Sequence, residues 1–246
     1  LQASADGRYV YVQNATPATS VTVVDVEAMS VVGEVPTPGC WGIYPALEGY
    51  KFSSICGDGT FATFTLGEEG ADAERAVSEQ IFDVDEDPIF VPAVRIDGDL
   101  VFMSYHGNLY TLSDEGDAIE LVSTVSITEG IDEEWAPGGY GLLAYSPTPG
   151  ILFVPMHSEP YDGSHKNASE EIWAYDVEAG EVLYRTIVEG VISLAATDEE
   201  APVLYAINEH EGTVMSFSTD PEAKFVLKEI AEAGTPGWAT IVTVRQ

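Results

Sequence analysis

The sequence predicts an all-β protein, a β-propeller of four-stranded antiparallel blades. The first observation is the stretch 191–230, in which apolar runs of strand length alternate with turn-forming clusters of Asp, Glu, Pro and Gly. The four runs are 191–197, 203–208, 213–218 and 224–230. Connections this short join only neighbouring antiparallel strands, so the stretch predicts one small meander.

The second observation is that the same pattern recurs along the chain. A turn followed by an aromatic and β-branched strand begins at 6–7, 48–49, 97–98, 149–150 and 200–201. These starts lie about 40 to 50 residues apart, which is the period of four-stranded propeller blades. A third observation is the tetrapeptide Asp-Val-Glu-Ala, found at 25–28 and again at 176–179 in the same hairpin position. We therefore expect about five blades in one domain, residues 1–246.

The first two blades account for residues up to 82. Blade one is expected over 1–36, with strands near 9–13, 20–25 and 30–35 after the tail of a strand at 1–5. Blade two is expected over 38–82. It contains Gly-Asp-Gly at 57–59, a strong turn signal because glycine adopts a positive φ at little cost.

The remaining blades follow the same order. Blade three is expected over 87–126 with a turn at 106–108, and blade four over 138–188 with one long polar insertion, 157–170. Blade five is the repeat at 191–230, and 238–244 predicts the innermost strand of a further blade. That blade would need strands from upstream sequence, so we expect the chain to be truncated at its N-terminus.

Charge is the most unusual global feature. The chain has 42 acidic and nine basic residues, a formal net charge of −33. Such a field repels nucleic acids and anionic lipids and favours cationic ligands or a basic partner; alternatively, it is a solvated surface suited to salty surroundings. The sequence has no apolar run of about 18 residues and no charged leader before an apolar stretch, so we expect neither a membrane span nor a signal peptide.

Motifs for bond chemistry are missing from the sequence. It has no GxSxG, P-loop or GxGxxG pattern, so we expect no catalytic or cofactor-binding residue on this chain. Asp83, Asp85 and Asp87 alternate as in a calcium loop, but Pro88 and Val94 stand where glycine and a bidentate Glu are needed. We interpret these residues as an acidic connection between blades and expect no metal site.

Loops and aromatic residues offer candidate contact surfaces. His157 and His165 bracket the long insertion, and long loops often carry contacts, although two histidines eight residues apart on a loop are more often exposed to solvent than ligands. Aromatic side chains near inner strands and inter-blade turns fit either packing between blades or a partner surface. They are Trp41, Tyr44, Tyr105, Trp135, Tyr140 and Trp238.

The two cysteines, Cys40 and Cys56, lie at the ends of one turn-and-strand segment. They are either buried thiols or, because they flank adjacent antiparallel strands, a disulfide. A disulfide would place the protein in an oxidising compartment. No CxxC pair or Cys/His cluster indicates a metal.

A family resemblance extends over nearly the whole chain. Residues 38–70 read PGCWGIYPALEGYKFSSICGDGTFATFTLGEEG. This stretch resembles the heavy subunit of methylamine dehydrogenase and of aromatic amine dehydrogenase, with a cysteine, an Ile-aromatic-Pro step, and a second cysteine followed by a residue and Asp-Gly. Further matches follow in the family's order at 135–139, 144–145, 165–169 and 202–206. Each motif is weak alone, and the ordered set is fairly specific.

The resemblance implies a fold and a partner. It implies a seven-bladed propeller, of which about five blades are present, with Cys40 and Cys56 forming a disulfide. The family's heavy subunit is periplasmic and binds a light subunit, two of each per complex. The light subunit carries tryptophan tryptophylquinone and oxidises a primary amine to an aldehyde and ammonia. Electrons then pass to a small copper protein or a similar carrier.

On this basis we expect a non-catalytic scaffold that docks the light subunit of an amine dehydrogenase. The expected interface residues lie near turns of blades three and four: Tyr105, His106, Trp135, Tyr140 and His157. One alternative is a stand-alone propeller that binds a partner. Another is a lactonase-type propeller hydrolase, which needs inward-facing Glu, Asn and Asp around a central cation.

Overall fold

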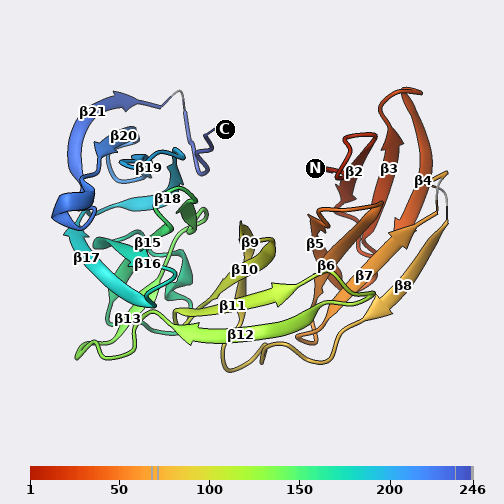
Figure 1. Ribbon diagram of the computed structural model, residues 1–246, viewed down its shortest axis with the longest axis horizontal. Coiled ribbons are helices and arrows are strands. Elements are labelled where there is room, and N and C mark those ends of the chain that lie inside the picture. The colour runs from red at the N-terminus through yellow and green to blue at the C-terminus, as the bar shows by residue number, and fades with distance from the viewer. Residues whose placement is uncertain (68, 71, 236, 245–246) are drawn as a thin grey trace. The chain divides into compact units, whose positions relative to one another are not determined.

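The structure is a computed structural model and describes residues 1–67, 69–70, 72–235 and 237–244. Within these residues the strands form five antiparallel sheets, and Figure 1 traces them in chain order from red to blue. Helical structure in the described residues is limited to two single-turn 3₁₀ segments, η1 (Ser164–Lys166) and η2 (Pro221–Ala223). The all-β fold class predicted from the repeat is confirmed.

The five sheets divide the strands as follows. The first contains β1 (Gln2–Ala3), β2 (Tyr9–Asn14), β3 (Ser20–Asp25) and β4 (Ser30–Pro36). The second contains β5 (Cys40–Pro45), β6 (Lys51–Cys56), β7 (Phe61–Leu66) and β8 (Ala73–Val77). The third contains β9 (Ile89–Ile96), β10 (Asp99–Ser104), β11 (Asn108–Ser113) and β12 (Glu120–Ser126). The fourth contains β13 (Trp135–Pro137), β14 (Ala144–Ser146), β15 (Ile151–Ser158), β16 (Glu171–Asp176) and β17 (Glu181–Ile187). The fifth contains β18 (Val191–Ala196), β19 (Val203–Asn208), β20 (Thr213–Ser218) and β21 (Lys228–Gly234).

Burial falls from the inner to the outer strands of a sheet. In the fifth sheet, β18 is apolar and almost entirely buried, whereas every residue of β21 is exposed. β21 reads KEIAEAG and offers little apolar surface to bury. Outer strands β4, β8, β12 and β17 are likewise mostly exposed or half-buried. Low burial therefore marks the last strand of each repeat.

The repeated Asp-Val-Glu-Ala tetrapeptide forms the same turn twice. Asp25 Oδ1 accepts a hydrogen bond from the Ala28 N–H at 2.7 Å, and Asp176 Oδ1 accepts one from the Ala179 N–H at 2.9 Å. The Ala28 N–H is the main cause that holds the pKa of Asp25 below its ordinary value. Each aspartate thus closes the hairpin between the last two strands of its sheet, β3–β4 and β16–β17.

Two boundaries differ from the prediction. Blade four was expected from residue 138, but β13 begins at Trp135, because the insertion extends β15 to Ser158 and gives β13 a partner. The last strand of blade five was expected from 224. There, the Asp220-capped turn of η2 is followed by Lys224 and Phe225, both at positive φ, so β21 begins only at Lys228.

The strand predicted at 238–244 was also wrong, since the described residues of this segment contain none. The Val242 N–H donates to Ser193 Oγ at 3.1 Å rather than to a backbone carbonyl. Trp238 is 86% exposed. A strand is defined by a continuous ladder of backbone hydrogen bonds to a neighbouring strand, and one side-chain hydrogen bond does not replace it. The alternating sequence of this segment was therefore not enough to predict a strand.

Two compact units share the chain. Unit one comprises Leu1–Val91, Asp97–Leu100 and Thr111–Ser123, and unit two comprises Pro92–Ile96, Val101–Tyr110 and Thr124–Gln246. The core of unit one joins the first two sheets through the ring stack of Tyr11, Phe52 and Phe64. The core of unit two joins the fourth and fifth sheets through side chains such as Phe153 and Leu204. Packing between successive sheets is what stabilises each unit.

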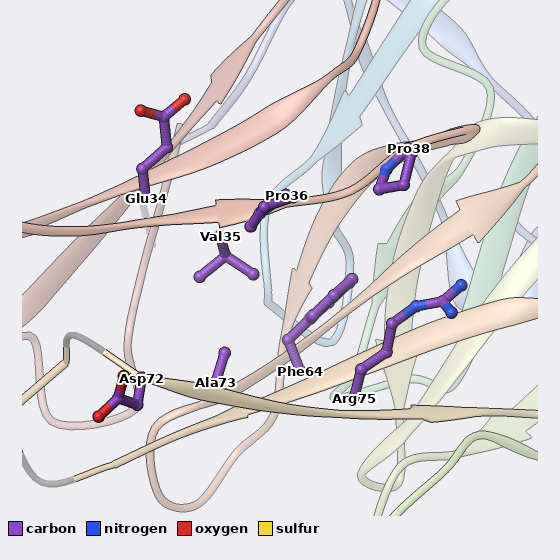
Figure 2. Close-up of a pocket in the computed structure, with 8 residues that line it drawn as sticks. All are labelled: Glu34, Val35, Pro36, Pro38, Phe64, Asp72, Ala73 and Arg75. Carbon is purple, nitrogen blue, oxygen red and sulfur yellow. The ribbon is translucent and has the colours of Figure 1, made fainter.

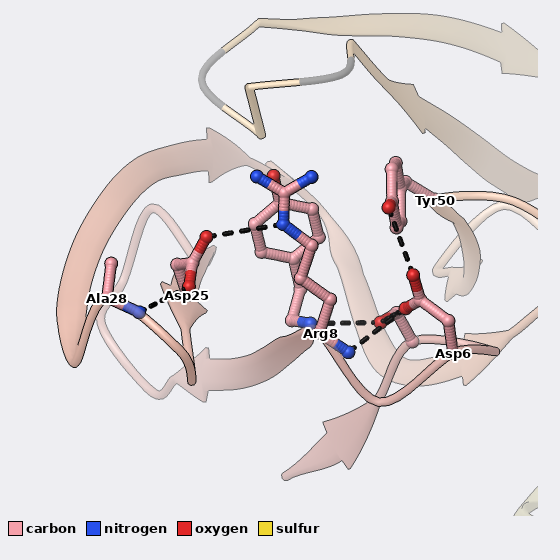
Figure 3. A network of polar contacts seen from close by, with 7 residues as sticks. Asp6, Arg8, Asp25, Ala28 and Tyr50 are labelled. Atoms are coloured by element: carbon pink, nitrogen blue, oxygen red, sulfur yellow. Dashed lines mark hydrogen bonds and ion pairs between the residues drawn. The ribbon is translucent and has the colours of Figure 1, made fainter.

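Polar contacts reinforce unit one at the edge of this core (Figure 3). Arg8 Nε donates to Asp25 Oδ2 at 3.3 Å, and its guanidinium lies 4.8 Å from the centre of the Tyr9 ring. The Tyr50 hydroxyl, from the second sheet, donates to Asp6 Oδ2 at 3.0 Å. The network therefore joins the first blade to the second.

The cysteines form a disulfide, Cys40–Cys56, as the resemblance implied. The two residues are direct partners in the register of β5 and β6, and both are buried. The bridge fixes the first strand of the second sheet to the second strand. None of the helices in the part of the chain that the structure describes has the length and apolar character needed to cross a membrane.

Candidate partner-docking site

The predicted interface residues lie in unit two, around the start of the fourth sheet. β13 runs antiparallel to β15, with Trp135 opposite Ser158 and Ala136 opposite His157. Two of the predicted residues are thus brought together by strand pairing. Residues 135–139 (Trp-Ala-Pro-Gly-Gly) carry part of the family resemblance, but their sequence shows no alternation that predicts the strand β13.

A glycine-rich loop follows β13 and presents Tyr140. The Gly139 N–H donates to His165 O at 3.0 Å, the Tyr140 N–H to Ile192 O at 2.7 Å, and the Leu194 N–H to Gly141 O at 2.8 Å. The loop is therefore tied both to η1 and to β18. Tyr140 itself is 39% exposed.

Glycine is required in this loop because other backbone lies so close. A Cβ on Gly138 would be 2.4 Å from Asn167 O. Gly139 has a φ of +118°, and a Cβ there would be 2.6 Å from Ile192 O. Side chains at these positions would push the loop away from its two supports. The two glycines therefore let the loop pack against both supports, which fixes the position of the Tyr140 backbone.

Tyr105 stacks on the ring of His165, with centroids 4.3 Å apart and planes at 18°. Burial raises the pKa of Tyr105 above its ordinary value. Burial also lowers the pKa of His165, and the charge of neighbouring Lys166 acts in the same direction. Both rings are therefore neutral around pH 7. His106, next along the chain, is exposed.

His157 is almost fully buried, at 2% exposure. Its Nδ1 lies 3.1 Å from Ser158 O, and because a carbonyl only accepts, Nδ1 is the donor of this contact. Its Nε2 is buried and has no hydrogen-bond partner in the described part of the chain. His157 thus offers a partner almost no surface of its own, and can contribute to an interface only by supporting its neighbours.

Trp135 is also largely buried, at 8% exposure. Its ring lies 5.6 Å from that of Trp173, and the Arg185 guanidinium lies 4.4 Å from Trp135 and 4.8 Å from Trp173. Arg185 Nε donates to Glu171 Oε2 at 2.6 Å, and the same oxygen accepts from Trp173 Nε1 at 2.7 Å. No local sequence pattern predicts this cluster, because its members come from β13, β16 and β17.

Of the five predicted residues, Tyr140 and His106 are exposed, Tyr105 is half-buried, and Trp135 and His157 are buried. Sequence reasoning missed His165 as the ring under Tyr105, although it had singled out this histidine at the end of the insertion. Tyr105 and His165 are 60 positions apart in the chain, so no local sequence pattern predicts that their rings stack.

The acidic run at Asp83, Asp85 and Asp87 forms a turn. Among the described residues, no three or more His, Cys, Asp or Glu side chains lie together as a metal site requires. Asp83 Oδ1 instead accepts hydrogen bonds from the N–H groups of Asp85, at 2.9 Å, and Glu86, at 3.1 Å. The acidic run is therefore a turn that Asp83 closes.

The repeated sheets place this chain among the β-propeller proteins, and solved structures agree. One is the periplasmic gluconolactonase PpgL of Pseudomonas aeruginosa, at 16% identity and a TM-score of 0.59, covering 94% of this chain and 68% of that one. Another is the β-propeller domain of Cps50 (Swd1) from Myceliophteria thermophila, at 10% identity and a TM-score of 0.58, covering 94% and 70%. At such low identity these similarities show the fold alone.

The chain belongs to the methylamine dehydrogenase heavy chain family, whose model matches residues 2–243. The methylamine dehydrogenase heavy chain of Methylobacillus flagellatus is 23% identical over 220 residues, 87% of this chain and 54% of that protein. The heavy chain of Paracoccus versutus is 26% identical over 200 residues, 78% of this chain and 45% of that protein. The chain spans about half the length of the curated relatives it matches.

Proposed function

We propose that this chain is part of the heavy subunit of a quinoprotein amine dehydrogenase. Its role is to dock a light subunit during the oxidation of a primary amine to an aldehyde and ammonia. The observation that carries the proposal is the family match over residues 2–243, nearly the whole chain. The disulfide supports a periplasmic location, since such bridges persist in oxidising compartments.

This chain contributes no catalytic residue in the proposal. Tryptophan tryptophylquinone on the light subunit supplies the electron-accepting chemistry, and a small copper protein receives the electrons. Two heavy and two light subunits form the complex. The chain's own residues hold the light subunit in position, and the exposed carboxylates are available to attract basic groups on a partner surface.

Tyr140 is the centre of the proposed docking surface. Its N–H donates to Ile192 O and the N–H of the preceding Gly139 donates to His165 O, while the Tyr140 side chain remains exposed. A tyrosine presented in this way loses little conformational freedom on binding and buries a large aromatic area, the two properties of an interface anchor. Tyr105 and His106 lie on the neighbouring turn after β10.

The proposal is tested by measuring the affinity of the light subunit for Tyr140→Ala. Removing an anchoring ring from a docking surface raises the dissociation constant by about tenfold or more, since such residues contribute above about 1.4 kcal/mol. Tyr184→Ala is the matched control, because Tyr184 lies in the same unit and is 42% exposed. Affinity can be measured by surface plasmon resonance with the light subunit immobilised.

Two results would argue against the proposal. If neither variant changes the affinity, Tyr140 is not part of the docking surface. If the unmodified chain does not bind the light subunit, the docking role itself is wrong.

A further inference from the structure

A pocket of about 540 Å³ lies in unit two, at the start of the polar insertion 157–170. Its lining residues come from two segments and are Glu133, Glu134, Trp135, Ser158, Glu159 and Pro160. Strand pairing brings the two segments together, because Trp135 is opposite Ser158 and the Glu159 N–H donates to Glu134 O at 3.1 Å.

Glu134 and Glu159 place two like charges at opposite positions of this strand pair. Like charges so placed destabilise an antiparallel pair, and a cation between them removes the repulsion. Within the described residues, neither carboxylate takes part in an ion pair. Glu133 differs, since its Oε2 accepts from Trp135 Nε1 at 3.2 Å and lies 3.9 Å from Arg185 Nη2. Two carboxylates of the pocket are therefore available to a cation.

Trp135 gives the pocket an aromatic wall in a fixed position. Its ring lies 5.6 Å from the Trp173 ring and 4.4 Å from the Arg185 guanidinium, while Glu133 holds its Nε1. A lysine or arginine side chain packs its hydrocarbon stem on such a surface and keeps its charged group among polar groups. The pocket therefore matches a long cationic side chain, which contacts both the ring and the carboxylates.

Tyr161, the next residue of the insertion, extends this surface. It is 64% exposed, its hydroxyl donates to Asn167 Oδ1 at 3.3 Å, and its N–H donates to Ser164 Oγ at 3.1 Å. Asn167 O in turn lies close against Gly138, in the loop that presents Tyr140. One set of contacts thus connects the insertion to the docking surface proposed at Tyr140.

The pocket of about 410 Å³ between β4 and β8 in unit one, shown in Figure 2, has no comparable acidic wall. The Glu34 and Asp72 side chains point away from the floor that Val35 and Phe64 form. Charge therefore favours the pocket in unit two for a basic group.

We propose that the pocket beside Tyr161 receives a lysine or arginine side chain of the light subunit, with Tyr161 as a second aromatic anchor. This inference rests on the proposed function, because it names the chemical group that the docking surface receives. Charge complementarity argues for this occupant. The two carboxylates belong to a chain of net charge −33, which attracts a basic group and repels a second copy of the chain.

The test measures the affinity of the light subunit for the full chain by surface plasmon resonance at about 0.1 M and about 0.5 M sodium chloride. At the lower salt, Glu134→Gln and Glu159→Gln should each raise the dissociation constant about threefold to tenfold, because each removes a carboxylate that pairs with the cation. The variant with both changes should also bind with a weaker salt dependence. Tyr161→Ala should raise the dissociation constant about tenfold, and Tyr161→Phe should keep most of the affinity because the ring remains.

Glu178→Gln is the matched control for charge. Glu178 is exposed in the same unit, so the change removes one negative charge away from the pocket and should leave the dissociation constant as it is. In the free chain, Glu134→Gln removes one of two opposed like charges and should not lower the melting temperature. Weaker binding by this variant then reflects the lost carboxylate and not unfolding.

The outcomes separate this inference from the docking role. If the unmodified chain does not bind the light subunit, both are wrong. If it binds and Tyr140→Ala weakens binding, but the two glutamine variants and Tyr161→Ala do not, only this inference is overturned. Self-association of the free chain that Glu134→Gln abolishes, measured by native mass, would show a second copy in the pocket and would also overturn it.

Discussion

Arg185 lies beside two indole rings and donates to a carboxylate, so its one side chain makes three contacts. Its guanidinium makes cation–π contacts with the rings of Trp135 and Trp173, and its Nε donates a hydrogen bond to Glu171 Oε2 at 2.6 Å. Losing a charge-assisted hydrogen bond and two cation–π contacts removes stabilisation on the order of 2 kcal/mol. We expect Arg185→Met to lower the free energy of unfolding by about this amount, measured by urea denaturation.

Arg185→Lys should recover only part of the lost free energy of unfolding. The lysine ammonium is a compact charge without the planar, forked geometry of a guanidinium, and it cannot stack on both rings. Lys228→Met, on the exposed strand β21, is the control and should change the free energy by less than about 0.5 kcal/mol. If Arg185→Met has the same free energy of unfolding as the unmodified chain, the cluster contributes little to stability.

At the scale of the element, the loop after β13 depends on Gly138. A Cβ there would lie 2.4 Å from Asn167 O and 2.9 Å from His157 Cδ2, so either the loop or the insertion must move. Overpacking of this kind costs about 1 to 3 kcal/mol. Gly138→Ala should therefore lower the melting temperature in differential scanning calorimetry, and Gly234→Ala should not, since a Cβ there meets nothing within 4 Å.

Equal melting temperatures for the two alanine variants would show that the loop can relax without cost. In that case the close approach of Gly138 and Asn167 would not determine where Tyr140 lies.

The sequence predicted strand positions correctly wherever alternating apolar residues ended at a turn that a side chain of the turn itself closes. The hairpin at 25–28 is an example, because Asp25 closes it within four residues. β13 was missed because a three-residue strand has no periodicity to detect, and it exists only through its pairing with β15. The exposure of Tyr140 and the burial of His157 depend on contacts across the fold, which no local pattern records.

At the scale of the whole molecule, a net charge of −33 makes self-repulsion a large term in stability. Salt shortens the Debye length from about 10 Å at 0.1 M to about 3 Å at 1 M, which screens this repulsion. We expect the melting temperature to rise by several degrees over that range of sodium chloride. Choline chloride at equal ionic strength should act alike if screening is the cause. A fall in melting temperature would contradict this explanation.

The docking role is measured most directly by the native mass of the complex formed when this chain, tagged, is co-expressed with an amine dehydrogenase light subunit in the periplasm. If the chain docks the light subunit, the two subunits co-purify in equal numbers, with the light subunit's quinone absorbance in the same fraction. Recovery of the tagged chain alone, folded and with its Cys40–Cys56 disulfide formed, would contradict the docking role.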